Sequence, residues 1–210
     1  IPTGITIYAM PGSSTVWAMN DSSNTIFTSY GTVDGLTIAL TPYWLGVAMF
    51  LSTNSVTRNC RFTGGDFMLT NVADDNNHRR NMFLTKNSTN VILEDNVIEG
   101  FTASGLTSGV DFDDNAGGWW EIIGSSWVYA RRNVMKWGAN QTAANVTINV
   151  KRVREFYFED NTVTDSGGYF FKINSSCKNI FFRRNNVTIT GGNNTGYIAG
   201  LGDVTGADSS

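Results

Sequence analysis

The stretch Val91-Ile92-Leu93-Glu94-Asp95-Asn96-Val97-Ile98 carries the pattern that decides the fold. Apolar residues stand at its first, third and eighth places, a charged pair at the fourth and fifth, and asparagine at the sixth. The same pattern begins again at Val128, Phe156 and Ile180. Alternation with a period of two is typical of a strand and not of a helix. Since one such unit cannot bury its apolar face alone, the repeat predicts stacked units around a continuous core.

Each unit also predicts where the chain turns. Asparagine tolerates left-handed backbone angles and bonds locally, so we expect the sixth place to form a turn and the eighth place to begin another short strand. Further short strands are expected ahead of the units, at 49–51, 82–84, 146–150 and 170–173. We interpret the segment from Val56, which is out of phase by a residue, as another coil with a shortened turn. Ile5–Ile7, Ile26–Phe27 and Leu36–Ile38 indicate earlier, less regular coils.

These patterns favour an all-β solenoid over an antiparallel β-sandwich, which would also show short strands. Asn-Gly hairpin dipeptides do not occur in the chain, and the repeat keeps register with itself. The inward places predict five core residues, which are Leu93, Met135, Phe158, Val163 and Phe182. The charged pairs of successive units alternate in sign, and we expect them to form ladders of salt bridges between neighbouring coils.

The segment Asn90–Ile98 reads Asn-Val-x-Leu-x-x-Asn-x-Ile, which resembles the repeat of the pectate-lyase-like parallel β-helix superfamily. Within it the chain is most similar to bacteriophage tailspikes and polysaccharide depolymerases, and Ile1–Ile7 is similar to the strand that begins many such helices. The resemblance covers about residues 1–200. It implies a right-handed, single-stranded parallel β-helix, with residues 1–210 as a single domain that is a fragment of a longer protein. It is specific for fold and not for chemistry, because this fold hosts hydrolases, lyases, epimerases and binding shafts.

The composition limits the class of partner. The chain has 210 residues, a net charge of -3 and only 16% charged residues, so Asn, Ser, Thr and Gly must supply the polar surface. This is typical of extracellular β-rich proteins. Nucleic acid is not expected as a partner because there is no basic stripe, and membrane insertion is not expected because no apolar run reaches about 20 residues. No cofactor or metal is indicated, and Cys60 and Cys177 are expected to be buried free thiols.

A long insertion holds the first candidate site. The 37 residues between the units at Val91 and Val128 exceed the length of a minimal coil, so an insertion is predicted over 104–121. In Val110-Asp111-Phe112-Asp113 the two acids alternate with apolar residues and are expected on one face, about 6.5 to 7 Å apart. This lies within the roughly 5 to 9.5 Å used by the two carboxylates of glycoside hydrolases.

We therefore interpret Asp111 and Asp113 as acid and base or nucleophile, with Asp114 and Glu121 as further catalytic candidates. The segment also resembles a Gly-[Ile/Val]-Asp-[Ile/Phe]-[Glu/Asp] strand of phage β-helix proteins, although here the second acid is Asp and no Pro follows. The alternatives are a solvated acidic strand edge and a calcium site formed by the three aspartates, although the spaced ligands of a calcium loop are lacking.

Two further groups are candidates for substrate binding. Trp119 and Trp120 are adjacent, so on a strand one can enter the core while the other stacks on a sugar; alternatively, both pack over the insertion. His78, Arg79 and Arg80 lie in a polar connection with Asp74 and Asp75. They could bind uronic or sialic carboxylates or serve a lyase, and the alternative is a solvated turn.

The resemblance and the candidate sites lead to one functional hypothesis with two rivals. The chain is expected to bind and depolymerise bacterial surface polysaccharide, either capsule or O-antigen, as a homotrimer located outside the cell or in a virion tail. The rivals are a non-catalytic shaft or adhesin that binds glycan, and a secreted, monomeric polysaccharide lyase. Ile92, Tyr157 and Phe181 fall on outward places, where the contact between subunits is expected.

Overall fold

The computed structural model describes residues 1–10, 16–19, 27–40, 47–64, 81–101, 118–137, 146–164, 169–174, 176–188 and 200–201. All regular secondary structure in these ranges is β-strand, arranged in three sheets of seven strands each. Every strand pairing within them is parallel. The antiparallel β-sandwich is therefore excluded for this part of the chain.

The three sheets are named A, B and C, in the order in which the chain visits them. Sheet A contains β1 (Thr6–Tyr8), β4 (Thr32–Asp34), β7 (Val56–Arg58), β10 (Thr89–Glu94), β13 (Ser126–Arg131), β16 (Arg154–Glu159) and β19 (Lys178–Arg183). Sheet B contains β2 (Val16–Met19), β5 (Thr37–Leu40), β8 (Arg61–Gly64), β11 (Val97–Phe101), β14 (Val134–Trp137), β17 (Thr162–Thr164) and β20 (Asn186–Thr188). Sheet C contains β3 (Phe27–Ser29), β6 (Val47–Leu51), β9 (Asn81–Lys86), β12 (Gly118–Ile123), β15 (Val146–Lys151), β18 (Tyr169–Asn174) and β21 (Gly200–Leu201).

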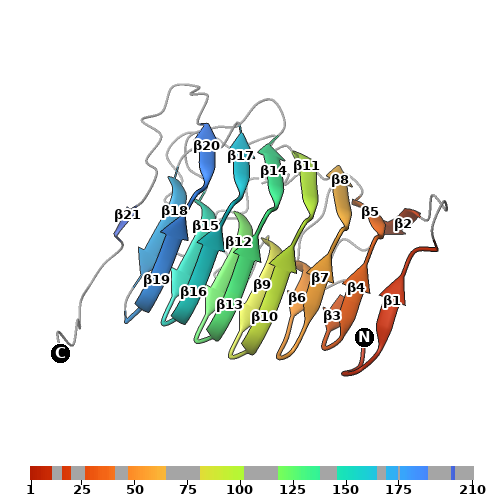
Figure 1. Ribbon diagram of the computed structural model, residues 1–210, viewed down its shortest axis with the longest axis horizontal. Helices are drawn as coiled ribbons and strands as arrows, with labels where there is room; N and C mark the ends of the chain where they lie inside the picture. The colour runs from red at the N-terminus through yellow and green to blue at the C-terminus, as the bar shows by residue number, and fades with distance from the viewer. Residues whose placement is uncertain are drawn as a thin grey trace, which may run out of the picture.

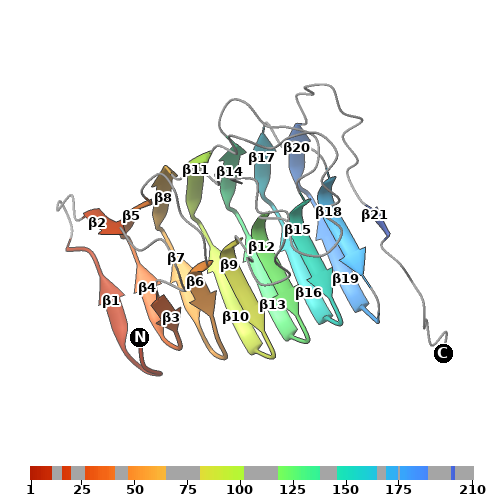
Figure 2. The same ribbon diagram turned by 180° about the vertical axis from the view of Figure 1, so that it is seen from behind.

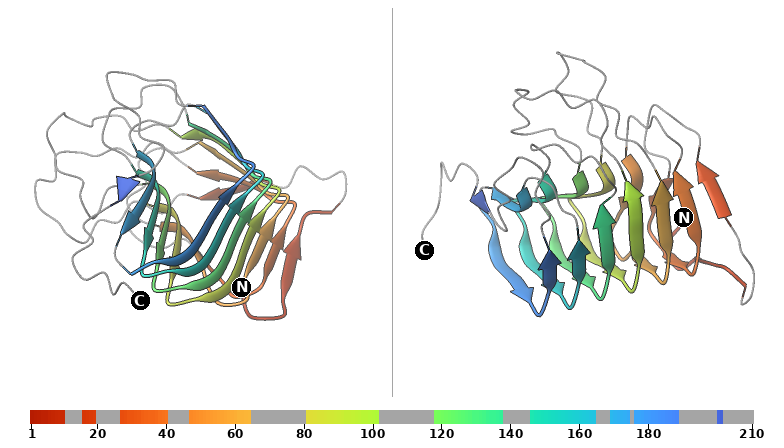
Figure 3. Two further views of the ribbon diagram at one scale, coloured as in Figure 1. Left: turned by 60° about the vertical axis from the view of Figure 1, so that its left-hand side comes forward. Right: turned by 90° about the horizontal axis from the view of Figure 1, so that it is seen from above.

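Each pass through sheets A, B and C forms one coil, and every strand pairs with the strand three places on in the sequence. Figures 1 and 2 show the coils as successive layers, with β1 and β19 at opposite ends. Figure 3 shows the three sheets facing one another around the interior. This arrangement is consistent with a β-helix solenoid, as the repeat predicts.

The interior is filled by the first, third and eighth places of the repeat. Leu93, Met135, Phe158 and Val163 are buried, which confirms four of the five predicted core residues. The prediction for Phe182 is wrong, because 40% of this residue is exposed. Its ring stacks on that of Phe158, at 5.2 Å between centroids, but β19 is the terminal strand of sheet A and has a neighbouring strand on one side only.

The repeated asparagines form the predicted column, but not by the predicted mechanism. Oδ1 of Asn133 accepts hydrogen bonds from the backbone N–H and Nδ2 of Asn96, and Nδ2 of Asn133 donates to the Leu93 carbonyl and to Oδ1 of Asn161. Asn185 continues this buried ladder beyond Asn161. The left-handed residue is instead the fifth place of each unit, as at Asp95, where φ is 55°. The asparagine therefore holds adjacent turns together, and the residue before it turns the chain.

The coil at Val56 has a turn of ordinary length, which corrects the prediction of a shortened one. Val56 pairs with Ile92, the second place of the next unit, and Thr57 pairs with Leu93. Cys60 accordingly takes the place of the asparagine, and its backbone N–H donates to Oδ1 of Asn96. The apparent loss of phase arose because a buried Thr and a buried Cys fill places that are apolar or Asn in the other units.

Candidate functional site

The corners of the solenoid differ in the length of chain that they contain. From β4 onward, sheet A is joined to sheet B by two residues in every coil, and sheet C is joined to sheet A by two to four. The connections from sheet B to sheet C contain between four and 16 residues. All of the variation that could add a functional group to the repeat is therefore concentrated at the corner between sheets B and C.

The two longest connections belong to consecutive coils. Residues 65–80 join β8 to β9, residues 102–117 join β11 to β12, and each connection contains 16 residues. β8 pairs with β11 and β9 pairs with β12, so both connections leave neighbouring strands and return to neighbouring strands. The first includes His78, Arg79 and Arg80, and the second includes Asp111, Asp113 and Asp114. These six residues lie outside the described ranges, and their predicted roles stay predictions.

The predicted insertion is too long at its end, because residues 118–123 form the strand β12 of sheet C. Trp120 on this strand is a core residue with 1% of its surface exposed. Its indole Nε1 donates to Oγ1 of Thr85, and its ring lies edge-on to Phe83 and Phe156. Trp120 is therefore the member of the pair that enters the core and cannot stack on a sugar. The stacking role stays a prediction for Trp119, whose side chain lies outside the described part of the structure.

Glu121 follows Trp120 and points to the outer face of sheet C, since side chains alternate along a strand. It lies between Leu84 of β9 and Asn149 of β15, and only 3% of its surface is exposed. Leu84 and Ile123 on the same face are also buried and pack with Phe50 as a small apolar cluster outside the main core. This part of the outer face is therefore closed to water, and Glu121 is a buried carboxylate, not the solvated loop acid that the predicted insertion implies.

Polar residues continue the outer face of sheet C beyond Glu121. Nζ of Lys151 lies 3.9 Å from Oε1 of Glu121, and Nδ2 of Asn174 donates to Oδ1 of Asn149 at 2.7 Å. Lys172 pairs in register with Asn149 on the next strand. We call Glu121, Asn149, Lys151, Lys172 and Asn174 the sheet C cluster. It combines a carboxylate, two amides and two ammonium groups, which are the groups that bind sugar hydroxyls and acidic sugar carboxylates.

Sequence analysis identified Glu121 but missed the other four members of the sheet C cluster. A signal for them exists, because Ile148-Asn149-Val150-Lys151 and Phe171-Lys172-Ile173-Asn174 both alternate apolar and polar residues. The polar places of such strands must face outward, and the register of two adjacent coils then brings them together. That register depends on the length of the connection 165–168, which the spacing of the asparagines alone does not divide among the turns.

The charged pairs at the corner between sheets A and B form the predicted ladders. Nε of Arg131 lies 2.7 Å from Oε2 of Glu94, and a nitrogen of Arg132 lies 2.7 Å from Oδ2 of Asp95. The hydrogen bond from Arg132 is the main reason why the pKa of Asp95 is lowered. Arg183 and Arg184 pair in the same way with the acids of the coil before them. These charges stabilise the stacking of the coils, which is the structural role expected from the sequence.

Neither cysteine provides a nucleophile. Cys60 and Cys177 are both free, and Cys60 is buried while Cys177 is half-buried. Burial raises the pKa of the Cys60 thiol to about 11 and also raises the pKa of Cys177, so both remain protonated at neutral pH. Since the thiolate is the reactive form, both groups act as packing and hydrogen-bonding residues.

Comparison with known proteins finds no match to this chain: no family model, no curated protein and no solved structure is similar enough to report. The described residues contain no group of three or more side chains placed to hold a metal ion. In the same residues, no helix is long and apolar enough to cross a membrane.

Proposed function

We propose that this chain is a right-handed, single-stranded parallel β-helix of the pectate-lyase-like superfamily, similar to bacteriophage tailspikes, and that it binds and depolymerises bacterial surface polysaccharide outside the cell or in a virion tail. One observation carries the proposal. The two longest connections, which contain the candidate acids and the His78–Arg80 group, begin and end on neighbouring strands of the same two sheets. Loops carried on a rigid scaffold are where binding and catalytic groups gather in proteins.

The proposed site lies at the corner between sheets B and C and has three parts. Asp111 and Asp113 act as the catalytic carboxylates on the glycosidic bond. Trp119 gives the sugar ring a flat apolar surface. The sheet C cluster and the His78–Arg80 group supply hydrogen bonds and positive charge, which suits an acidic polysaccharide. In this proposal Glu121 is a positioning residue that fixes Lys151, and not an acid that touches the glycosidic bond, because its carboxylate is closed to water.

A polysaccharide lyase is the second candidate function, and the pairing of Lys151 with Glu121 favours it specifically. A lyase neutralises the carboxylate of a uronic acid and removes the adjacent proton, so it needs cations beside a base. Two lysines on adjacent strands of the sheet C cluster fit this requirement. The products separate the two reactions, since elimination leaves an unsaturated sugar and hydrolysis does not.

The experiment is an assay of purified capsule and O-antigen polysaccharides for reducing ends and for unsaturated products. Asp113→Asn keeps the size and hydrogen bonding of the side chain but removes its charge, and we expect cleavage to fall at least about a hundredfold while glycan binding persists. Asp160→Asn is the matched control, because Asp160 is an exposed ladder acid on sheet A. Cleavage at the wild-type rate by Asp113→Asn contradicts the assigned acid, and binding without cleavage by the wild-type chain identifies a non-catalytic shaft.

A further inference from the structure

The outer face of sheet A presents a row of apolar side chains at the second place of each unit. Three aliphatic or small residues, Thr32, Val56 and Ile92, are followed in register by Tyr129, Tyr157 and Phe181. The aromatic rings stack on one another, with centroids 4.9 Å and 4.8 Å apart. Their faces are therefore occupied by each other, and the row offers ring edges to a partner. This favours a flat protein surface over a sugar that stacks on ring faces.

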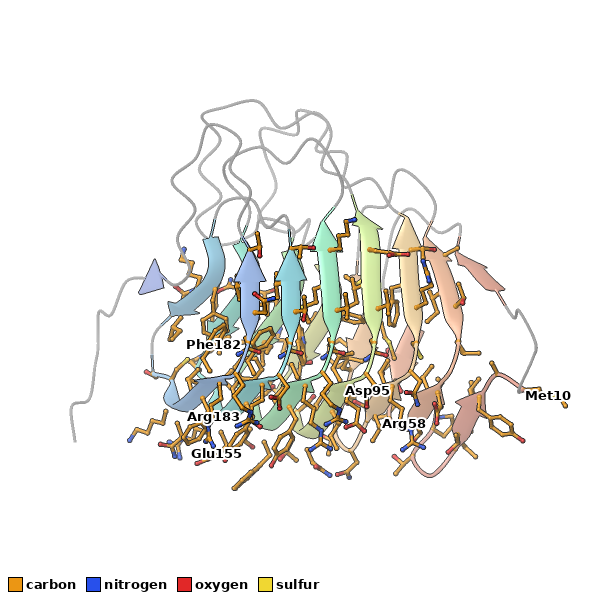
Figure 4. The ribbon with its side chains drawn as sticks, turned by 45° about the horizontal axis from the view of Figure 1, so that its top comes forward. Met10, Arg58, Asp95, Glu155, Phe182 and Arg183 are labelled. Atoms are coloured by element: carbon orange, nitrogen blue, oxygen red, sulfur yellow. The ribbon has the colours of Figure 1, made fainter. Side chains whose placement is uncertain are left out.

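A row of charges runs beside the apolar row, at the fourth and fifth places. From β4 to β19 its sign alternates at every coil, in the order Asp34, Arg58, Glu94-Asp95, Arg131-Arg132, Glu159-Asp160 and Arg183-Arg184. Figure 4 shows four of the residues of this face, Arg58, Asp95, Glu155 and Arg183, on the same side of the solenoid. The five arginines are each at least 40% exposed at the side chain, so they remain accessible to a partner.

An alternating row of six charged coils is complementary to its own reverse. When a second copy is turned about an axis parallel to the strands, its coils run in the opposite direction while each row still faces the same row. The first charged coil then faces the sixth, the second faces the fifth and the third faces the fourth. Asp34 meets the Arg183-Arg184 pair, Arg58 meets Glu159-Asp160, and Glu94-Asp95 meets Arg131-Arg132. Every level therefore brings opposite charges together.

We propose that the outer face of sheet A binds a second copy of this chain in an antiparallel dimer, with the twofold axis parallel to the strands and passing between β10 and β13. The same operation places the aliphatic half of the apolar row against the aromatic half. Ile92 packs against Tyr129 of the second copy, and Thr32 packs against Phe181. Small side chains thus lie opposite large ones, which keeps the spacing between the two sheets even along the contact.

The place before each unit forms a third row that also fits this arrangement. It contains Asn54, Asn90, Trp127, Glu155 and Asn179, all with positive φ. Trp127 is 48% exposed, and bulky residues seldom adopt a φ of 56°, so the repeat holds this indole outward against its conformational preference. In the antiparallel dimer Trp127 faces Asn90, and Glu155 faces Asn54. No like charges meet in this row.

The size of the face is sufficient for a modest dimer. Six strands at about 4.8 Å and five residues at about 3.3 Å give a flat area of about 29 Å by about 16 Å on each copy. Two such faces approach the roughly 1,000 Å² that a specific interface needs. A parallel dimer, with its axis along the solenoid, brings every coil opposite the same coil, so it places Glu159 against Glu155. Charge complementarity therefore selects the antiparallel arrangement.

The dimer is tested by a charge exchange between two variants. In Asp34→Arg, and separately in the double variant Arg183→Glu with Arg184→Glu, like charges meet at both ends of the dimer. We expect the Kd of each homodimer to rise at least about tenfold. When the two variants are mixed, opposite charges meet again at both ends, so the mixture forms a heterodimer with nearly wild-type Kd. Light scattering and sedimentation give the masses, and circular dichroism confirms that each variant is folded.

Cross-linking in a Cys177→Ser background then fixes the direction. Facing sheets lie about 10 Å apart, so a short bismaleimide joins Thr32→Cys of one copy to Phe181→Cys of the other. The antiparallel dimer gives this mixed product, whereas a parallel dimer joins each variant to itself. A monomer at every concentration, a homotrimer of the kind implied by the tailspike resemblance, or a mixture that fails to recover the dimer overturns the proposal.

Discussion

The corner between sheets A and B and the corner between sheets B and C belong to the same coils but are built in opposite ways. At the first corner every coil from β4 onward turns in two residues, and buried asparagines link successive turns. At the second corner the connections range from four to 16 residues. The first corner fixes the spacing and register of the coils. Because that is achieved there, chain of any length can be accommodated at the second corner.

This difference explains how one solenoid can be both regular and specialised. A buried amide that bonds to the coils on both sides tolerates little change, since each lost partner leaves a polar group unsatisfied in the interior. A surface connection tolerates insertions, because the entropy of closing a loop rises only slowly with its length. We therefore expect changes near the corner between sheets A and B to affect stability, and changes at the corner between sheets B and C to affect function.

The largest effect is expected in the core beside the corner between sheets A and B. Phe158→Ala removes a fully buried ring and should lower the free energy of unfolding by about 3 to 5 kcal/mol, measured in urea. Phe182→Ala is the matched control, because Phe182 occupies the same place one coil later but is partly exposed. It should cost clearly less. Equal losses at both positions would show that the end of the solenoid is as well packed as its middle.

A smaller loss is expected from the asparagine ladder itself. Asn133→Ala leaves the Asn96 N–H and the Leu93 carbonyl without their partner in the interior, and should cost about 2 to 4 kcal/mol. The control is Asn149→Ala on sheet C, whose amide lies on the outer face, and there we expect less than about 1 kcal/mol. A ladder variant as stable as the control would mean that water replaces the missing amide, and the contrast between the two corners would then lose its physical basis.

The two corners also differ in how far the sequence predicts them. The repeat predicted the column of asparagines, the alternating charges and the parallel coils, because each of these depends on places a fixed distance apart within a unit. It misplaced the left-handed residue, since Asp, Arg and Asn all occupy that place and none is the Gly that would identify it. The coil at Val56 was also misread, because Thr57 and Cys60 satisfy the same packing with other side chains.

Prediction was weaker at the corner between sheets B and C, for a different reason. The length of a connection does not show where it ends, so residues 118–121 were assigned to an insertion although they begin a strand. Trp120 and Glu121 then received exposed roles, whereas the register with β9 and β15 buries both. Adjacent tryptophans predicted that one of them is a core residue, but only the pairing of neighbouring coils identifies which.

A loop exchange sharpens the comparison at the second corner. Replacing residues 102–117 with Asp165-Ser166-Gly167-Gly168, which joins β17 to β18 in the same chain, shortens the connection fourfold. Loop closure alone changes the free energy of unfolding by only about 1 kcal/mol in favour of the shorter loop. We expect a folded protein that does not cleave polysaccharide. A loss of several kcal/mol would show instead that residues 102–117 cover Leu84 and Ile123 on the outer face of sheet C.

The smallest effect is expected from the exposed ladders at the first corner, and its sign follows from the carboxyl groups. The hydrogen bond from Arg132 lowers the pKa of Asp95, and that from Arg184 lowers the pKa of Asp160. A lowered folded-state pKa stabilises the protein above the unfolded pKa of about 3.9, and this contribution is lost as the pH falls through the folded value. For Asp95, solvent screening limits it to less than about 1 kcal/mol. Arg132→Gln should therefore flatten the decline in stability between about pH 4 and pH 2, measured by urea unfolding at each pH, and an unchanged acid profile would show that the ladder contributes to register but not to stability.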